Sequence, residues 1–258
     1  MACTLAWQTD KLASQLGPLL PGIRVEALAE SGSTNTLLAE RARVDAQPVL
    51  LVSESQTGGR GRMGRSWVAA PGCSLTFSIG LPLPAADWSG LSLAVGCSLA
   101  EALDPTGERV QLKWPNDLWL GDRKLGGVLI ESQPLADLRY LIVGVGLNVR
   151  AIPGAEADQF SSGFAALEEL APGLDAPAVL ARVAPGLLRT LLDFSREGFA
   201  PWQQRFERRD LTRDHPVTAG ELRGVARGVS STGELLLQTE SGMHPIASGE
   251  VSLRMDAR

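Results

Sequence analysis

The sequence is poor in the residues that build metal and redox centres. Its 258 residues include only three cysteines, Cys3, Cys73 and Cys97, without C-x-x-C spacing, and its two histidines, His215 and His244, stand far apart. These absences exclude the usual zinc and redox motifs. An odd and small number of cysteines favours a reduced cytoplasmic compartment and no structural metal.

Long apolar runs and an excess of positive charge are also missing. The sequence contains no run of about 18 apolar residues, which a membrane-spanning helix requires. The N-terminus also lacks the basic-then-apolar pattern of a signal peptide. The net charge is −5, which gives no general electrostatic reason to bind nucleic acid or an anionic membrane. Residues 1–30 carry only Lys11 and Arg24 as positive charges and show no helix-turn-helix pattern. We therefore expect neither a DNA nor a membrane partner.

Lysine is scarce, and its distribution is uneven. Of the 24 lysines and arginines, only Lys11, Lys113 and Lys124 are lysines. A genomic preference for arginine explains the scarcity, but not the two lysines within residues 113–124, where random placement predicts about 0.14. Arginine does not replace lysine where a compact ammonium must reach a phosphate or carboxylate. This segment is therefore a candidate for chemistry.

The apolar pattern predicts a mixed α and β chain in two parts. We expect helices over residues 36–43, 88–103, 176–194 and 202–209, and strands over residues 48–53, 74–81, 110–112, 118–120, 128–131 and 140–149. From residue 216 onward, short apolar runs alternate with glycines, which is typical of a small antiparallel β module. The predicted domains are residues 1–212 and residues 213–258.

A loop rich in glycine and arginine follows the strand predicted at residues 48–53. Positions 58–65 hold four glycines and three arginines. Glycine lets the backbone approach a ligand and arginine presents a forked donor, so the loop predicts an anion-binding site. Residues 59–64 also match G-x-G-x-x-G, but a turn and a strand over residues 71–81 follow instead of the helix that a dinucleotide-binding fold requires. An exposed flexible loop is the structural alternative.

Three further segments carry polar side chains at the ends of predicted elements. Residues 113–117 and 123–128 form a hairpin that combines two ammonium groups, an amide and a carboxylate, a set suited to nucleotide phosphates and Mg²⁺. Residues 33–35 precede a helix, and Asn148 ends a strand. Each segment also has a plainer explanation, respectively polar decoration of a hairpin, an N-cap and a strand end.

Taken in order, these motifs resemble those of the biotin protein ligases. The resemblance is carried by Ser33 to Asn35, Gln56 to Trp67, Lys113 to Asp117, Arg123 to Gly127, Gly144 to Asn148, and the C-terminal stretches that begin at Arg223 and Ser248. It covers nearly all of residues 31–254. It implies an α+β fold, in which a mixed β-sheet with flanking helices, similar to class II synthetases, binds biotin and ATP and precedes a small SH3-like β-barrel.

The resemblance also implies a role for each matching side chain. The expected biotin contacts are Ser33, Thr34, Asn35, Gln56, Arg60, Gly61, Arg62 and Lys124. The expected ATP contacts are Arg60, Arg62, Trp67, Lys113, Asn116 and Asn148. The expected catalytic residues are Lys124, Arg62 and Lys113, and Asp117 is the expected ligand or organiser of Mg²⁺. The chain departs from the family pattern at Met63, where some members carry another basic residue.

The implied activity has two half-reactions. Biotin and Mg-ATP give biotinyl-5′-AMP and pyrophosphate, and a lysine of the biotin carboxyl carrier protein of acetyl-CoA carboxylase then accepts the biotin. We expect a short member without the DNA-binding domain of repressor-type members, acting as a monomer or homodimer. One alternative is a lipoate or octanoate ligase, which shares the acyl-adenylate chemistry, although Gln56 and the arginines favour biotin. The other is a non-enzymatic biotin-responsive regulator, which the lack of a basic DNA-binding element disfavours.

Overall fold

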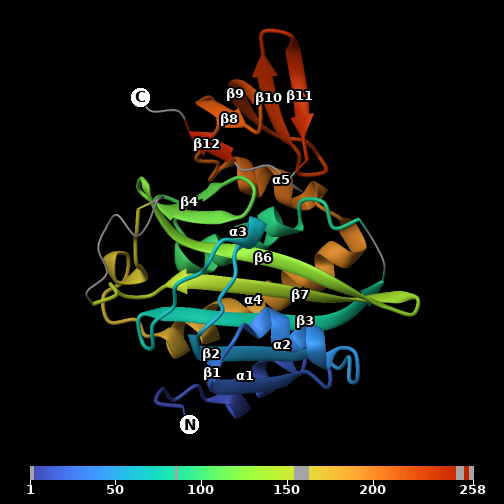
Figure 1. Ribbon diagram of the computed structural model, residues 1–258, viewed down its shortest axis with the longest axis vertical. Helices are drawn as coiled ribbons and strands as arrows, with labels where there is room; N and C mark the ends of the chain where they lie inside the picture. Colours follow the sequence, from blue (N-terminus) through green and yellow to red (C-terminus); the bar gives the residue numbers. More distant parts are fainter. Residues whose placement is uncertain (1–2, 85–86, 154–162, 248–252, 256–258) are drawn as a thin grey trace.

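The computed structural model describes residues 3–84, 87–153, 163–247 and 253–255 (Figure 1). Its centre is a seven-stranded sheet of order β1-β2-β3-β7-β6-β5-β4. β1 runs parallel to β2, and the other neighbouring pairs are antiparallel. The strands are β1 (Arg24–Ser31), β2 (Val49–Gln56), β3 (Ser74–Pro84), β4 (Val110–Lys113), β5 (Asp117–Leu120), β6 (Arg123–Leu135) and β7 (Leu138–Asn148).

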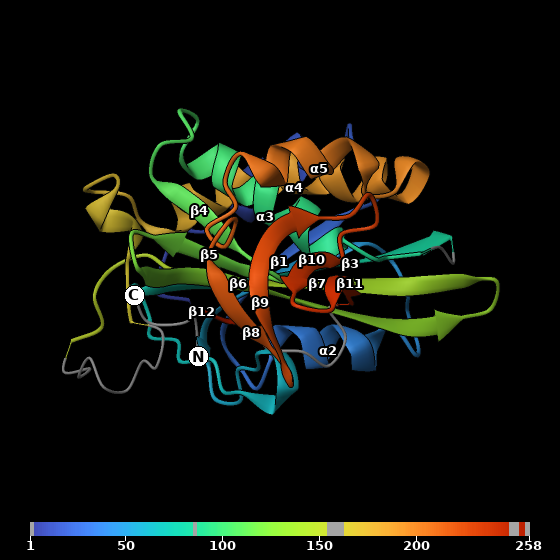
Figure 2. The same ribbon diagram turned by 90° about the horizontal axis from the view of Figure 1, so that it is seen from above.

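Helices cover both faces of this sheet (Figure 2). The helices are α1 (Thr9–Leu16), α2 (Thr34–Arg41), α3 (Leu91–Leu103), α4 (Ala176–Glu197) and α5 (Ala200–Glu207), with short 3-10 turns η1 (Arg62–Gly64) and η3 (Leu167–Glu169). α1, α3 and α4 pack on one face and α2 on the other, while α5 packs against α3. Because both faces are covered, β2 is buried from Val49 to Glu54, which explains the continuous apolar run in the sequence.

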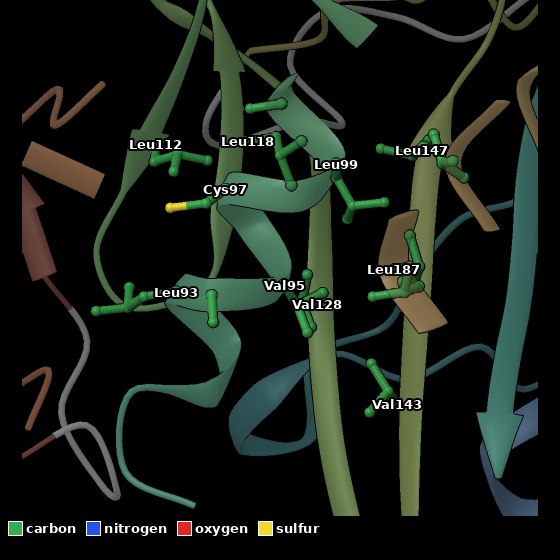
Figure 3. Packing of buried hydrophobic residues seen from close by; sticks show 14 of the residues in the cluster. Leu93, Val95, Cys97, Leu99, Leu112, Leu118, Val128, Val143, Leu147 and Leu187 are labelled. Atoms are coloured by element: carbon green, nitrogen blue, oxygen red, sulfur yellow. The ribbon is translucent and has the colours of Figure 1, made fainter. Parts of the chain in front are cut away.

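The main hydrophobic core lies between the sheet and α3 and α4 (Figure 3). α3 lies between the β4–β5 hairpin, which contributes Leu112 and Leu118, and the strands that carry Val128 and Val143. Cys97 of α3 is fully buried in this core, where burial raises the pKa of its thiol to about 12. Such a thiol is inert, so this cysteine fills space and has no redox role.

A second, five-stranded antiparallel sheet follows the helices. Its order is β11-β10-β9-β8-β12, and its strands are β8 (Pro216–Ala219), β9 (Leu222–Val229), β10 (Leu235–Thr239), β11 (Gly242–Ile246) and β12 (Leu253–Met255). The predicted α+β class and the antiparallel module beyond residue 216 are therefore confirmed. Over the described residues β11 and β12 form the two edges of this sheet, so its closure into a barrel stays a prediction.

Hydrogen bonds tie the second sheet and its connecting segment to the β4–β5 hairpin. Leu112 donates its backbone N–H to Arg209 O at 2.7 Å and accepts one from Leu211 at 3.0 Å. The buried Trp114 donates its indole N–H to Gly233 O at 3.1 Å. Of these contacts, the Trp114 hydrogen bond crosses the predicted boundary at residue 212, and the exact division stays a prediction.

The first thirty residues are more ordered than their weak pattern suggests. The sequence pattern predicts no element there, whereas the structure has α1 and β1. The buried carboxylate of Glu54 accepts backbone N–H groups of Thr4 and Leu5 and the indole N–H of Trp7, all within 3.0 Å. Burial works to raise the pKa of Glu54, but these hydrogen bonds lower it overall.

Every helix in the described ranges is too short or too polar to cross a lipid bilayer.

Candidate active site

A cavity of about 1300 Å³ opens on the face of the sheet that α2 covers. Val145 and Leu147 of β7 point into the main core, so the alternating Gly144 and Gly146 point to the opposite face, towards the cavity. The start of α2 and the arginine loop, residues 57–67, also contribute to its walls. All the site residues predicted from the sequence line this cavity: Ser33, Thr34, Asn35, Gln56, Arg60, Gly61, Arg62, Trp67, Lys113, Asn116, Asp117, Lys124 and Asn148.

One end of the cavity is lined by hydroxyls and amides. Ser33 caps α2, because its Oγ accepts the backbone N–H of Thr36 at 3.4 Å. Thr34 donates its backbone N–H to Gln56 Oε1 at 2.8 Å, and the Ser78 hydroxyl donates to Thr34 Oγ1 at 2.7 Å. Capping does not remove these groups from the cavity, because both Ser33 and Thr34 also line it.

Asn35 is buried at this end and held from several sides. Its Nδ2 donates to Glu131 Oε2 at 2.8 Å, and its Oδ1 lies 2.6 Å from Ser78 Oγ. A Cβ at Gly144 would stand 2.3 Å from Asn35 Oδ1. The first glycine of the Gly144 to Asn148 motif is therefore explained by the space that the Asn35 amide needs.

The arginine loop folds back over the cavity, and beyond its first residue it contacts the sheet through Trp67 and Arg60. At its base, Trp67 donates its backbone N–H to Gly59 O at 2.9 Å. The Trp67 indole lies against bare backbone of β7, since a Cβ at Gly146 would be 2.5 Å from the indole Cε2. The second contact is an ion pair, 3.1 Å between Arg60 Nη2 and Glu131 Oε1.

The other end of the cavity concentrates cations around a carboxylate. Lys124 Nζ lies 2.7 Å from Asp117 Oδ1, and both side chains are largely buried. Lys113, which ends β4, has its Nζ 4.8 Å from the centre of a Trp119 ring. Burial lowers the pKa of Arg62, although the charge of Asp117 opposes this effect. Such a cluster creates a positive potential that suits phosphate and carboxylate ligands.

Lys113 has a lower pKa than an ordinary lysine. Burial is the largest cause; the carboxylate of Asp117 opposes it, and the positive charges of Lys124 and Arg65 add to it. A phosphate beside Lys113 would relieve the repulsion among these cations. The electrostatics of this end of the cavity therefore favour an anion.

The two predicted ATP-side amides brace the backbone of the cavity wall. Asn116 donates its Nδ2 to Val128 O at 2.7 Å. Asn148 is buried, and its Nδ2 donates to Ala165 O at 2.9 Å and Lys124 O at 3.2 Å. Both residues line the cavity, but each Nδ2 already donates to a backbone carbonyl, and direct contact with ATP stays a prediction.

Comparison with known proteins covers both parts of the chain. Residues 29–148 match the biotin/lipoate A/B protein ligase family, and residues 217–254 match the biotin protein ligase C terminal domain. The bifunctional ligase/repressor BirA of Escherichia coli is 36% identical over 251 residues, which cover 94% of this chain and 78% of that protein. The chain belongs to the biotin protein ligase family.

Two further biotin ligases are similar over most of their length. The biotin–[acetyl-CoA-carboxylase] ligase of Mycobacterium tuberculosis is 30% identical over 250 residues, 88% of each chain. The solved structure of the biotin protein ligase from Aquifex aeolicus in complex with biotin and ATP has a TM-score of 0.75 at 32% identity, covering 90% of this chain and 99% of that chain. The family resemblance predicted from the motifs is thereby confirmed.

In this biotin ligase fold, the segment after α5 and the second sheet also supply cavity residues that sequence reasoning missed. They are Asp210, Leu211, His215 and Met255. Asp210 Oδ1 accepts the backbone N–H of Thr212 at 2.8 Å, and burial raises the pKa of the Asp210 carboxyl. No local pattern marks these residues, because only the packing of the second sheet against the hairpin brings them to the cavity.

Glu131 was missed as well, although it contacts two predicted site residues. It ends the strand predicted at residues 128–131, where an acidic residue reads as a solvated strand end. The available signal was alternation: Gly127 and Leu129 line the cavity, so the next residue on that face of β6 is Glu131. The alternation in β6 could thus have predicted the face to which the Glu131 side chain points, but not its contacts with Asn35 and Arg60.

Proposed function

We propose that this chain is an ATP-dependent biotin protein ligase. In the first half-reaction, a biotin carboxylate oxygen attacks the α-phosphorus of ATP, and pyrophosphate leaves. In the second, the amine of a carrier lysine attacks the acyl carbon of biotinyl-5′-AMP, and AMP leaves. The observation that carries the proposal is a cavity that joins a hydroxyl- and amide-lined end to a cationic end in a chain of this family. Catalysis then rests on positioning and charge neutralisation, without a covalent enzyme intermediate.

Ser33, Thr34, Asn35 and Gln56 are the proposed partners of the biotin ring system. The ureido group of biotin has N–H donors and a carbonyl acceptor, which hydroxyl and amide side chains can match. The dithiolane ring of lipoate has no such groups and would leave this polar end of the cavity unsatisfied. The chemistry of this end therefore supports biotin over lipoate or octanoate.

The cations are the proposed catalytic groups. Biotin carboxylate and ATP repel each other, so their encounter requires fixed positive charge. We assign Lys124 to the biotin carboxylate and α-phosphate, and Lys113 to the other phosphates. Arg60, Gly61 and Arg62 would close over biotin and the adenylate. The lysines reach this region from β4 and β6, the two strands that flank β5 in the sheet, and so hold the charges in place before substrate arrives.

Trp67, Asn116 and Asn148 are the proposed contacts on the nucleotide side. The Trp67 indole, which lies against Gly146, gives this part of the cavity a flat apolar wall. The hydrogen bonds that Asn116 and Asn148 donate to backbone carbonyls fix the strands around it. Their part in ATP binding would then be to shape the wall as well as to contact the nucleotide.

Asp117 is the proposed protein ligand for Mg²⁺. Among the described residues there is no group of three or more His, Cys, Asp or Glu side chains that could hold a metal. Asp117 Oδ1 already pairs with Lys124. Such a carboxylate suits a magnesium ion that takes most of its other ligands from substrate phosphates, which is how proteins usually bind Mg²⁺. Bound there, Mg²⁺ would neutralise phosphate charge, while Lys124 keeps Asp117 oriented.

A lysine of the biotin carboxyl carrier protein of acetyl-CoA carboxylase is the proposed acceptor. The activity for which the Mycobacterium tuberculosis relative is named supports this choice. A cytoplasmic location, the absence of a DNA partner, and a monomeric or homodimeric state remain part of the same proposal. The non-enzymatic alternative predicts biotin binding without any turnover of ATP.

Biotin-dependent exchange between pyrophosphate and ATP tests the first half-reaction. The wild type should exchange with biotin and not with lipoate or octanoate offered under the same conditions. Lys124→Ala should lower the rate by about 10²–10³-fold, the usual cost of losing a preorganised transition-state contact. Lys11→Ala is the matched control, because Lys11 is an exposed residue of α1. Exchange with lipoate alone, or undiminished exchange in Lys124→Ala, would contradict the proposal.

The second half-reaction needs its own assay. A purified carrier domain should become biotinylated at one lysine in the presence of biotin, ATP and this protein, and a carrier domain with that lysine replaced should stay unmodified. Peptide mass spectrometry gives the site. Exchange without transfer to the carrier would leave the adenylation chemistry standing and overturn the choice of acceptor.

A further inference from the structure

Glu131 is an acidic residue of the cavity face of β6 that joins a loop to a buried amide. Its Oε1 lies 3.1 Å and its Oε2 3.3 Å from Arg60 Nη2. Its Oε2 also accepts the Asn35 Nδ2 at 2.8 Å. The Glu131 side chain is 32% exposed, whereas that of Arg60 is 47% exposed. A carboxylate from the sheet thus links the guanidinium of the loop to the buried Asn35 amide.

The arginine loop has a composition that favours many conformations. It contains four glycines within positions 58–65, and Met63 adopts a left-handed backbone conformation with φ 55° while 61% exposed. Glycine-rich chain loses much conformational entropy when it is fixed, so a closed loop requires contacts outside itself. The Arg60 pair with Glu131 supplies one such contact, at the edge of the cavity where Asn35 marks the polar end.

We infer that Glu131 is a positioning residue that holds the arginine loop closed through Arg60, and so retains the acyl-adenylate in the cavity until the carrier lysine arrives. The inference rests on the proposed function. Glu131 acts at a distance from the reacting atoms, through the loop. Because an open loop would release a mixed anhydride that reacts with any amine, the ion pair controls which lysine receives the acyl group.

The surroundings of Glu131 favour a role in positioning the loop over a direct electrostatic effect on the substrate. A carboxylate beside the cavity disfavours an anionic substrate, so Glu131 has no place there as a direct ligand of phosphate. Arg60 and the Asn35 amide N–H stabilise the negative charge of Glu131. This charge therefore does not weaken the positive potential around Lys113 and Lys124. Glu131→Gln keeps an oxygen for Asn35 Nδ2 and removes the charge that binds Arg60, so it isolates the contact with the loop.

The test measures adenylate escape in the full-length protein without a carrier. Biotin and ATP labelled at the α-phosphate are supplied, and free biotinyl-AMP per pyrophosphate formed is determined, with biotinylation of a lysine-rich bystander protein as a second readout. Glu131→Gln and Glu131→Ala should raise the released fraction by about 1.5-fold to fivefold, the range for losing one partly exposed ion pair. Arg60→Ala should do the same, and Arg60→Ala/Glu131→Ala should release no more than Arg60→Ala alone, since coupled residues do not add.

Glu26→Gln is the matched control. Glu26 pairs with Arg41 at 2.6 Å and is 31% exposed, nearly as exposed as Glu131, but it lines a separate hollow beside β1 and α2. The Glu26→Gln variant should release the same fraction of biotinyl-AMP as the wild type. An unchanged released fraction in Glu131→Gln, or additive effects in the double variant, would overturn this inference while normal biotin-dependent pyrophosphate exchange leaves the proposed function intact. Absence of that exchange in the wild type would overturn both.

Discussion

Lys113 and Lys124 share a cavity but differ in their surroundings. Lys124 has the carboxylate of Asp117 at 2.7 Å, whereas Lys113 lies among buried groups and other cations, and its pKa is lowered. As the pH rises, Lys113 loses its proton earlier than an ordinary lysine. A phosphate contact that depends on its ammonium is lost in the same range.

The pH dependence of kcat/KM for ATP should show this ionisation, because that parameter reports groups of the free enzyme. We expect an alkaline decline that begins below the usual lysine range. Lys113→Arg should move the decline to higher pH, since a guanidinium stays charged, at a lower plateau because its fork does not replace the compact ammonium. Lys11→Arg should leave the profile unchanged. An alkaline limb that Lys113→Arg does not move would contradict the assignment.

The residues of the cavity were predictable to different degrees. The ordered motifs identified polar positions such as Ser33, Gln56 and Lys124, because binding a polar or anionic ligand restricts the residue type at each of them. Glu131 was not predicted, because its importance comes from Arg60, which is 71 positions away in the sequence. The bracing hydrogen bonds of Asn148 were hidden for the same reason, since local sequence does not identify a tertiary partner.

At the scale of elements, β7 shows how a strand can serve two faces. Val143, Val145 and Leu147 pack into the main core, while Gly144 and Gly146 leave room on the cavity side for Asn35 and Trp67. A Cβ at either position would come within 2.5 Å of its neighbour or closer. The two glycines therefore belong to different halves of the site.

Alanine at each glycine should separate the two substrates kinetically. Gly144→Ala displaces the Asn35 amide and should raise KM for biotin by about tenfold or more, with KM for ATP little changed. Gly146→Ala displaces the Trp67 indole and should do the reverse. Overpacking of this kind costs about 1–3 kcal/mol. Steady-state kinetics with each substrate varied in turn provides the measurement, and circular dichroism checks that both variants fold. Equal effects on both KM values would contradict this division.

Elements with a strong apolar pattern, and the long amphipathic helix α4, were predicted well, whereas α1 and β1 were not. β2 and α3 are buried over most of their length, so hydrophobicity alone reveals them. β1 is a half-exposed edge strand without clean alternation, and its pairing with β2 is what defines it. The start of α2 was expected about two residues late because Ser33 is its N-cap, which leaves Thr34 inside the helix.

At the scale of the whole molecule, a buried ion pair joins the end of α3 to the segment before the second sheet. Arg209 donates to Asp104 Oδ2 at 3.3 Å and to the backbone oxygens of Asp104 and Val110. Burial works to raise the pKa of Asp104, but hydrogen bonds from the N–H groups of Val110 and Arg109 and from the Thr106 hydroxyl, together with Arg209, lower it to about 2.

This carboxylate makes stability depend on acid. Because the folded-state pKa lies below the ordinary aspartate pKa of 3.8, Asp104 stabilises the fold above about pH 4, and this contribution is lost as the pH falls towards 2. Asp104→Asn should lower the free energy of unfolding by about 2 kcal/mol at neutral pH, with the difference shrinking below pH 4. Urea unfolding at a series of pH values measures it. Asp45→Asn, in an exposed pair with Arg24, is the control, and a pH-independent deficit in Asp104→Asn would contradict the expectation.

The scarcity of lysine has a practical consequence for handling the protein. Lys113 and Lys124 lie within the cavity, whereas Lys11 is exposed on α1, which packs against α4 on the opposite face of the central sheet. With the α-amino group chemically blocked, an amine-directed dye or resin would attach at Lys11, behind the sheet. The molecule would then be immobilised in one orientation, with its cavity turned to the solution.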